Sequence, residues 1–571
     1  MKLKAVAFTA ALLLLCLIPS AGMLVLGPSG ARANELAPET PELLDASGAP
    51  NAQLLSDTAE YLNESFAFRQ ELITLWARVE ALFGQSAEDG VILGSDGWLY
   101  YAEELSDYSG LGLMTEREIF AAARNLALMA EYVEGLGADF LFTVAPNKST
   151  LYPEHMPHYI RSGAASNAGR LKAALESAGV AYADLFEAFG AREETLYFEH
   201  DSHWTSAGAA LAADAINAAL GVESAYFEGG ARETVRHEGD LYEMLYPSAA
   251  DPETDEAPSG LEFSQGDGVR PDSITIDTRG GGEGALLMFR DSFGELLYPY
   301  MADSWAEARF SRQAAYDLSA AAELGSRAVV IELVERNIPW LLEQPAGFPA
   351  PERDRELSSA QPGEAGLTLR QDGEQHRVSG AISGRIDFDS PVYISYNHHC
   401  YEASLTGDGF SALLPGEGGG EYGIYWYSDG ALKCALADKL KERGNGHEKD
   451  CCNAALRPAG AEHGGLRTGR DRGPGGELRR PDRRGRDPRR GRARRDRDPR
   501  RGRGRRGREP ARHGQAVRGR AARGPHRRRG RAGEQRLRAE LPGRRRGRQP
   551  LLRRLHGLHV QGRQRRDSKL C

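Results

Sequence analysis

The segment "ALLMFRDSFGELL" at 285–297 passes from an apolar run to Arg290, Asp291 and Ser292, and then to Gly294. Its consecutive apolar residues predict a buried strand, and the residues after Gly294 have the spacing of a helix. In α/β proteins, the loops beyond the carboxyl ends of such strands carry the reactive groups. This segment therefore predicts an α/β fold with the Ser292 hydroxyl at one edge of the sheet.

The same alternation of strand and helix continues on both sides of this segment. Strands are expected at 138–146, 284–289 and 326–335, a strand leading into a helix at 180–189, and helices at 117–137, 167–179, 206–221 and 294–305. Repeated units of this kind imply a mainly parallel sheet with helices on both faces. The predicted fold class is α/β, with a flavodoxin-like three-layer arrangement.

Two further regions flank this domain. Before it, 58–84 has helical spacing that ends at Gly84 and predicts one long helix, and 91–105 predicts two strands around a Ser-Asp-Gly turn. After it, the composition of 346–366 is that of a linker. The segments that follow alternate aromatic and β-branched residues at period two, namely 376–383, 391–407 and 421–436. They predict a small β-sandwich-like module. Its expected last strands would fall where the sequence turns to arginine, so the module could be truncated.

The N-terminus predicts export from the cytoplasm. Lys2 and Lys4 precede an apolar stretch at 5–26, which is typical of a secretory signal or a single-span anchor. Ala31-Arg32-Ala33 offers a cleavage site of small residues, but the apolar stretch is also long enough to span a bilayer. Both alternatives place the acidic body of the chain outside the cytoplasm.

The last 131 residues differ from the rest in charge. Residues 441–571 hold 44 of the 72 Lys and Arg residues but 14 of the 81 Asp and Glu residues, and they contain no Phe, Trp, Tyr or Ile. Such a segment cannot bury enough apolar surface to offset its ordering entropy, so we expect disorder. An Arg-rich arm for nucleic acid is one reading. We favour the other, a GC-rich gene translated in the wrong frame after about residue 445, and expect no nucleic-acid partner.

The chain accordingly divides into parts of different character. We expect a signal peptide or signal anchor at 1–33, a linker at 34–55, the α/β domain at 56–345, a β-sandwich-like accessory module at 366–440, and a disordered Arg-rich tail at 441–571. Cys400 and Cys434 lie in the accessory module and could pair in an oxidising compartment or remain free. No glycine-rich nucleotide loop stands between a strand and a helix, so no cofactor is expected.

The segment "HDSHWT" at 200–205 can supply partners for Ser292. A serine hydroxyl needs a base within hydrogen-bond reach, and that base needs a third group to orient it. Residues two apart in an extended or turn segment project from the same side. Asp201 can therefore accept from one ring nitrogen of His203 while the other nitrogen faces Ser292, and Trp204 would shield the site from solvent.

Each of these residues also has a simpler interpretation. Ser292 could cap the helix that follows it, and His203 could be a core histidine. His200, Asp201 and His203 could bind a metal ion, but three ligands within four residues fit zinc less well than spread ligands do, so no metal is expected.

Several motifs resemble one family. "HDSHWTSAGA" at 200–209 and "FRDSFG" at 289–294 are similar to the signature pair of the alginate O-acetyltransferase AlgJ/AlgX type and the related DHHW proteins, whose fold is SGNH-hydrolase-like. Further similarities follow the order of the family, namely "FAFRQELI" at 66–73, "GVILGSDGWLYY" at 90–101 and "APNKSTLYPEHMP" at 145–157. The resemblance covers roughly 56–340. It implies that Ser292 is the nucleophile, His203 the base and Asp201 its orienting partner.

The sequence departs from the family pattern at two positions. Ser202 stands at the second position of the DHHW motif, and Arg290 stands where a GDS motif would have Gly. The second difference leaves part of the oxyanion hole unassigned, with the Ser292 backbone N–H as one candidate donor. Arg290 and Lys148 are candidates for positioning an acidic or sugar substrate, although a structural salt bridge is an equal alternative for each.

The resemblance implies an extracytoplasmic O-acyltransferase that acetylates a cell-envelope or exported polysaccharide. It also implies a membrane-bound O-acyltransferase as acetyl donor. The close alternative is an acetyl esterase, because water in place of the sugar would make the same residues deacetylate glycans. A third alternative, from a different class, is a non-catalytic envelope protein that binds a glycan.

Overall fold

The computed structural model describes residues 2–30, 39–45, 48–159, 161, 165–313, 315–343, 347–407 and 409–437. The predicted cleavage site at 31–33 and the Arg-rich tail at 441–571 lie outside the described residues.

A seven-stranded sheet forms the centre of the main domain, in the order β4-β3-β11-β9-β10-β8-β7. The strands are β3 Asp139–Ala145, β4 Tyr182–Ala183, β7 Phe263–Gln265, β8 Thr275–Gly280, β9 Ala285–Phe289, β10 Glu307–Ser311 and β11 Ala328–Val334. Neighbouring strands from β4 to β10 pair in parallel, whereas β8 and β7 add antiparallel pairs at one edge. The prediction of a mainly parallel sheet is confirmed.

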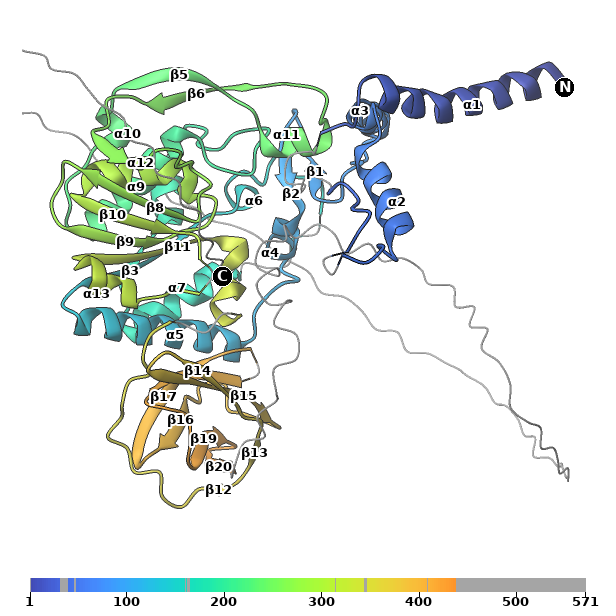
Figure 1. The fold of residues 1–571 in the computed structure, drawn as a ribbon. Helices are drawn as coiled ribbons and strands as arrows, with labels where there is room; N and C mark the ends of the chain where they lie inside the picture. The colour runs from blue at the N-terminus through green and yellow to red at the C-terminus, as the bar shows by residue number, and fades with distance from the viewer. Residues whose placement is uncertain are drawn as a thin grey trace, which may run out of the picture. The chain divides into compact units, whose positions relative to one another are not determined.

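Helices cover both faces of this sheet (Figure 1). Leu287 and Phe289 of β9 pack into one core with α5 Glu116–Gly135, α7 Asn167–Ala178 and α13 Ser319–Leu324. Leu286 and Met288 pack into the other core with α8 Leu185–Gly190, α9 Ser206–Ala219 and α12 Gly294–Ser304. Successive side chains of a strand point to opposite faces, so a continuous apolar strand is what a sheet buried on both sides requires.

The N-terminal helices differ from the prediction. The chain forms α1 Lys2–Val25, α2 Leu54–Ser65 and α3 Arg69–Ala81. The single helix expected at 58–84 is wrong, because Phe66 is extended and Phe68 has φ 66°, which ends one helix and redirects the next. Helical spacing continues across this break, so the spacing alone could not reveal it.

Smaller elements surround the carboxyl edge of the sheet. A short hairpin, β1 Val91–Leu93 with β2 Leu99–Tyr101, turns at Asp96 and Gly97 as predicted. A second hairpin, which the sequence did not reveal, leads into and out of α11 Asp240–Leu245. Its strands are β5 Arg232–His237 and β6 Glu253–Pro258. The remaining short elements are η1 Ala102–Glu104, α4 Leu105–Ser109, α6 Lys148–Leu151, α10 Tyr226–Gly229 and η2 Glu335–Leu342.

The C-terminal module is a near-barrel and not the predicted β-sandwich. Its strands form one connected sheet in the order β12-β20-β19-β16-β17-β18-β15-β13, and β14 pairs with β15. They are β12 Gln361–Pro362, β13 Glu364–Ala365, β14 Thr368–Asp372, β15 Gln375–Ser383, β16 Val392–Tyr396, β17 His399–Leu405, β18 Gly409–Pro415, β19 Tyr422–Ser428 and β20 Ala431–Ala437. Strand β17 pairs with both β16 and β18, which joins the two halves of the curved sheet. Cys400 and Cys434 are free thiols.

Candidate active site

Ser292 lies on the turn between β9 and α12. Asp291, which is mostly buried, fixes this turn. One of its carboxylate oxygens accepts the Phe293 N–H at 2.9 Å, and the other accepts the Val334 N–H at 2.8 Å and the Asn337 amide at 2.9 Å. The N-cap of α12 is Phe293, and no side chain caps the helix. The hydroxyl of Ser292 is therefore not engaged as a helix cap.

His203 and Asp201 lie on the loop between α8 and α9. The loop is closed by backbone hydrogen bonds from Phe198 to His203 and from Thr205 to Leu196, and the Thr205 side chain caps α9. The indole N–H of Trp204 donates to the Phe293 carbonyl at 3.1 Å. This bond joins the histidine loop directly to the serine turn, although 89 residues separate the two segments.

The structure brings the three predicted catalytic residues together. Nε2 of His203 lies 2.8 Å from Oγ of Ser292, and Nδ1 lies 2.7 Å from Oδ1 of Asp201. The side chain of His203 is 21% exposed and that of Asp201 is 5% exposed, so the ring reaches solvent while the carboxylate does not. When the ring is neutral, a proton on Nδ1 faces the carboxylate and leaves Nε2 free to accept from the hydroxyl.

Asp201 accepts hydrogen bonds from two further groups that sequence reasoning missed. The His237 ring lies 2.8 Å from its Oδ2, and the Asp240 N–H donates to the same oxygen at 3.0 Å. Its Oδ1 accepts both the ring N–H and the backbone N–H of His203. Four donors thus hold one buried carboxylate, which fixes the orientation of the His203 ring.

A glycine allows this second group of residues to approach. A Cβ on Gly239 would clash with the carbonyl oxygen of His200, so only glycine lets the β5–α11 connection close onto the histidine loop. The segment "HEGD" at 237–240 places a glycine between His237 and Asp240. This was the one signal in the sequence that could have indicated that these two residues approach the site.

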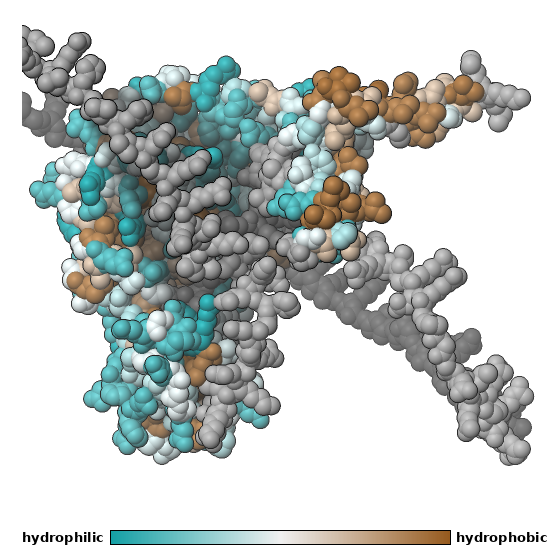
Figure 2. All heavy atoms as spheres, in the orientation of Figure 1, coloured by the Kyte–Doolittle hydropathy of each residue, from teal (hydrophilic) through white to brown (hydrophobic). Residues whose placement is uncertain are grey.

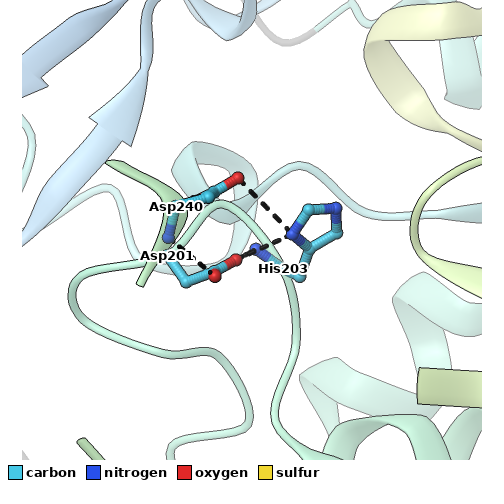
Figure 3. Close-up of side chains that lie close together, drawn as sticks. All are labelled: Asp201, His203 and Asp240. Atoms are coloured by element: carbon cyan, nitrogen blue, oxygen red, sulfur yellow. Dashed lines mark hydrogen bonds and ion pairs between the residues drawn. The ribbon is translucent and has the colours of Figure 1, made fainter. Parts of the chain in front are cut away.

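Asp240 is a second carboxylate that faces the same ring nitrogen, Nδ1 of His203 (Figure 3). Its Oδ2 lies 3.7 Å from Nδ1 of His203 and accepts from the hydroxyl of Ser202 at 2.7 Å. Its Oδ1 accepts the backbone N–H of Ser202 at 2.8 Å. Ser202, at the second position of the motif, therefore holds Asp240 and does not face Ser292.

Burial and charge shift the pKa values of these groups in opposite directions. Burial alone would raise the pKa of Asp201, but the charge and hydrogen bonds of His203, with those of His237, hold it well below its usual range. Burial lowers the pKa of His203, but the Asp201 carboxylate outweighs burial and, with Asp240, raises it to about 9. Burial, followed by the charge of Asp201, raises the pKa of Asp240 to about 6. His203 is thus largely protonated at neutral pH.

Asp201, His203 and Asp240 have ligand atoms within 4.8 Å of one another, close enough to surround a metal ion. Their contacts are nevertheless those of hydrogen bonds. Nδ1 of His203 faces a carboxylate oxygen, and Asp240 faces the N–H and hydroxyl of Ser202. An ion would have to displace these donors, so the arrangement fits a hydrogen-bonded relay better than a ligand set. His200 does not join the cluster, since its ring faces the Asp251 carbonyl.

The three candidate substrate-binding residues make internal contacts instead. The ammonium group of Lys148 is fully buried and donates to the carbonyls of Leu99, Glu199 and Asp201 at 2.6, 2.8 and 3.0 Å. Burial lowers the pKa of Lys148 to about 8. All three N–H donors of the ammonium group bind backbone carbonyls, so Lys148 stabilises the loop that carries Asp201.

Arg290 and Trp204 are also buried. The Arg290 guanidinium donates to the carbonyls of Pro271 and Ser273, which anchors the start of the serine turn. Trp204 lies beneath the site, stacked on Phe189 and edge-on to Phe293. Neither side chain lines an open surface beside Ser292.

The fold and the site together define an α/β domain with a serine, a histidine and an aspartate at the carboxyl edge of its sheet. Residues 91–271 match the family described as SGNH hydrolase-like domain, acetyltransferase AlgX. This region therefore matches an SGNH hydrolase-like domain of the AlgX/AlgJ acetyltransferase type, and the resemblance seen in the sequence is confirmed there. The match contains Asp201 and His203 and ends before Ser292.

Individual proteins show weaker similarity. The chain is 31% identical to a "Probable alginate O-acetylase AlgJ" of Pseudomonas syringae pv. tomato over 99 residues, which is 17% of this chain. It spans 24% of the length of that curated relative. Among solved structures, PatB1 of Bacillus cereus with a sulfonyl adduct has a TM-score of 0.36 at 14% identity, covering 44% of this chain and 96% of that one. The O-acetyltransferase domain of Pseudomonas putida AlgJ has a TM-score of 0.30 at 19% identity, covering 44% and 92%.

Proposed function

We propose that this protein is an extracytoplasmic O-acyltransferase that places acetyl groups on hydroxyls of a cell-envelope or exported polysaccharide. The observation that carries the proposal is the continuous chain of short contacts from the Ser292 hydroxyl through His203 to Asp201. The AlgX-type match of residues 91–271 supports the choice of acetyl transfer. The apolar helix α1 supports a location outside the cytoplasm.

In the first half of the proposed reaction, Ser292 Oγ attacks the acetyl carbonyl carbon while Nε2 of His203 takes the hydroxyl proton. The bond from the acetyl group to its donor breaks, and the donor oxygen leaves with that proton. In the second half, a sugar hydroxyl attacks the Ser292 ester. His203 takes the proton of the sugar and returns it to Oγ as the ester bond breaks.

The negative charge on the carbonyl oxygen needs hydrogen-bond donors. The backbone N–H of Ser292 is our candidate, because it forms no hydrogen bond within the described part of the chain and lies just before the N-terminus of α12. The positive end of a helix dipole favours a developing oxyanion at this position. A membrane-bound O-acyltransferase is our proposed source of the acetyl group.

A serine-directed fluorophosphonate tests the nucleophile. We expect one label per chain, located at Ser292 by mass spectrometry, and no labelling of the Ser292→Ala and His203→Ala variants. Ser202→Ala is the matched control, because this hydroxyl contacts Asp240 and Nδ1 of His203 on the side of the ring away from Ser292. It should still be labelled at Ser292. A folded wild-type protein that takes no label, or a label elsewhere, contradicts the proposal.

Product analysis separates the transferase from the esterase. With an aryl acetate donor and an oligosaccharide acceptor, a transferase yields O-acetyl sugar that requires Ser292, whereas an esterase yields only free acetate. Unchanged acetylation of the envelope polymer in cells that carry a folded Ser292→Ala variant would favour the non-catalytic glycan-binding alternative.

A further inference from the structure

Most of the exposed face of α3 is apolar, which is the reverse of an ordinary surface helix, and Glu71 and Arg78 are the exposed charged residues of the helix. The side of α3 that packs on the domain carries the buried residues Thr74 and Ala77. The large apolar side chains point outward at spacings of three and four residues and continue just past the end of the helix. We call these residues the α3 stripe: Leu72 (36% exposed), Leu75 (60%), Trp76 (58%), Val79 (38%), Leu82 (84%) and Phe83 (75%).

A contiguous apolar stripe marks an interaction surface, whereas scattered exposed apolar residues do not. Figure 2 shows apolar surface over α1 and around α2 and α3, while most of the visible surface elsewhere is hydrophilic. A pocket of about 300 Å³ opens beside the stripe, between α3 and α11. Its apolar lining comes from Leu72, Ile73, Trp76, Ala87, Met244 and Leu245.

The beginning of α3 is attached to the end of α1. Gly22 of α1 packs so closely that a Cβ there would lie 2.7 Å from Ala67 Cβ and from the Phe68 ring. Two hydrogen bonds continue this contact, from the Ser29 N–H to the Ser65 carbonyl at 2.8 Å and from the Gln70 amide to the Gly30 carbonyl at 3.1 Å. These contacts hold the start of α3 against the end of α1, although α2 stands between the two helices in the sequence.

The length of α1 indicates where this junction lies. The stretch Lys4–Val25 has 22 residues with a mean hydropathy of 2.3. At 1.5 Å per residue it is about 33 Å long, which matches the hydrocarbon thickness of a bilayer. Because Gly22 and Val25 are at the far end of this stretch, a membrane-spanning α1 would place the start of α3 at the level of the outer lipid headgroups.

We propose that the α3 stripe lies on the outer surface of the membrane that α1 spans. The occupant of the stripe is lipid: acyl chains contact the leucines and Phe83, and the Trp76 indole lies at the headgroup level, where tryptophan is enriched. The inference requires that α1 stays attached to the chain. It does not rest on acetyl transfer, because fluorophosphonate labelling of Ser292 reads out the proposed function independently.

Depth-dependent quenching of tryptophan tests the proposal. The full chain is placed in nanodiscs of phosphatidylethanolamine and phosphatidylglycerol whose acyl chains carry bromine. We expect quenching that disappears in Trp76→Phe and persists in Trp340→Phe, a matched control because Trp340 is 45% exposed on η2. Equal quenching of wild type and Trp76→Phe overturns the proposal.

Charged substitutions supply a second measurement. Leu75→Glu and Leu82→Glu should make Trp76 accessible to aqueous acrylamide in nanodiscs, and Leu111→Glu should not, since Leu111 is 86% exposed outside the stripe. Three results exclude a lipid occupant and overturn the proposal. They are two chains per disc that separate in the charged variants, a photo-crosslink from position 75 to another protein, and an intact mass that lacks residues 1–25.

Discussion

Two carboxylates face Nδ1 of His203, and in the proposed reaction the protonation of this ring decides when Ser292 can react. Asp201 is the nearer acid at 2.7 Å and Asp240 the farther one at 3.7 Å. Both stabilise the imidazolium, which helps the ring hold a proton during the reaction. The same stabilisation opposes the neutral ring that is needed to begin it.

The reaction should therefore be faster at alkaline pH. The pKa of His203 is raised to about 9, so the neutral base becomes more populated as pH rises, and kcat/KM for an aryl acetate should rise toward a midpoint near 9. Asp240→Asn removes one negative charge and should move this midpoint to lower pH. Asp267→Asn, an exposed substitution between β7 and β8, is the control. Identical midpoints for Asp240→Asn and wild type would contradict the electrostatic role of Asp240.

His237 should act as a positioning residue through Asp201. His237→Ala removes one of four donors to a buried charge, and a charged hydrogen bond contributes about 1.5–3 kcal/mol, so kcat/KM should fall roughly 10- to 100-fold. His237→Gln keeps an N–H donor and should recover part of the loss, whereas His158→Ala, on an exposed loop, should change nothing. A purely structural role would instead lower stability, with no rescue by glutamine.

The sequence could predict some of these residues for definite reasons. Ser292 follows an apolar strand, and Asp201 and His203 are two residues apart, so local patterns made them candidates, and the family resemblance joined them into one site. His237 ends a mostly polar strand and Asp240 begins a short helix, and neither element gives a periodic signal. Lys148 was predicted to contact substrate because a lone lysine in a motif does not reveal that three carbonyls surround it.

At the scale of elements, the turn from β9 to α12 depends on close packing at Gly294. A Cβ there would lie 2.6 Å from Cβ of Arg290, a buried side chain that is anchored by two carbonyls. Gly294→Ala should therefore lower the free energy of unfolding by about 1–3 kcal/mol, which is typical of overpacking. Chemical denaturation measures this change. Gly281→Ala, with no atom within 4 Å of the added Cβ, should be close to neutral, and equal effects would exclude packing as the cause.

Element prediction succeeded where an apolar period was strong. The strands β3, β9 and β11 are continuous apolar runs, and α5, α7 and α9 have clear spacing and side-chain caps. The break between α2 and α3 was missed because the spacing continues through Phe66–Phe68. The antiparallel strands β7 and β8 were missed because polar residues alternate there with few apolar ones.

At the scale of the whole molecule, α5 joins the central sheet to the β module. Glu402 of β17 is 1% exposed and accepts from Arg124 at 2.6 Å and from Arg353 at 2.7 Å. Asn125 of α5 adds hydrogen bonds to the backbone of Leu405 on β17. Ion pairs of this kind fix the relation of the module to the α/β domain.

Removing Glu402 should loosen this junction. Glu402→Ala leaves two arginines without their buried partner and should cost about 2–3 kcal/mol. This is less than for a fully buried pair, because Arg124 and Arg353 are 34% and 23% exposed. Calorimetry should resolve two transitions in place of one. Asp272→Ala, which breaks the exposed pair with Arg270, should have little effect, and a single unshifted transition in Glu402→Ala would contradict the coupling.

The sequence predicted the α/β class of the main domain but not the closure of the module. Alternating residues identify β16, β17 and β19 as strands, yet the pattern is the same in a sandwich and in a curved single sheet. One curved sheet forms in place of two because β17 pairs with both β16 and β18, and the sequence pattern does not reveal which strands pair.

The short helix α11 links the candidate active site to the pocket beside the α3 stripe. Asp240 at its first residue contacts His203, and Leu245 at its last residue lines the pocket beside Trp76. Six residues rise only about 9 Å, comparable to the Debye length of about 10 Å at 0.1 M salt. With α3 on the bilayer as proposed, a polymer that reaches Ser292 would enter the ionic atmosphere of anionic headgroups. Acidic polymers should thus be acetylated more slowly at low ionic strength, and uncharged ones should show no such dependence.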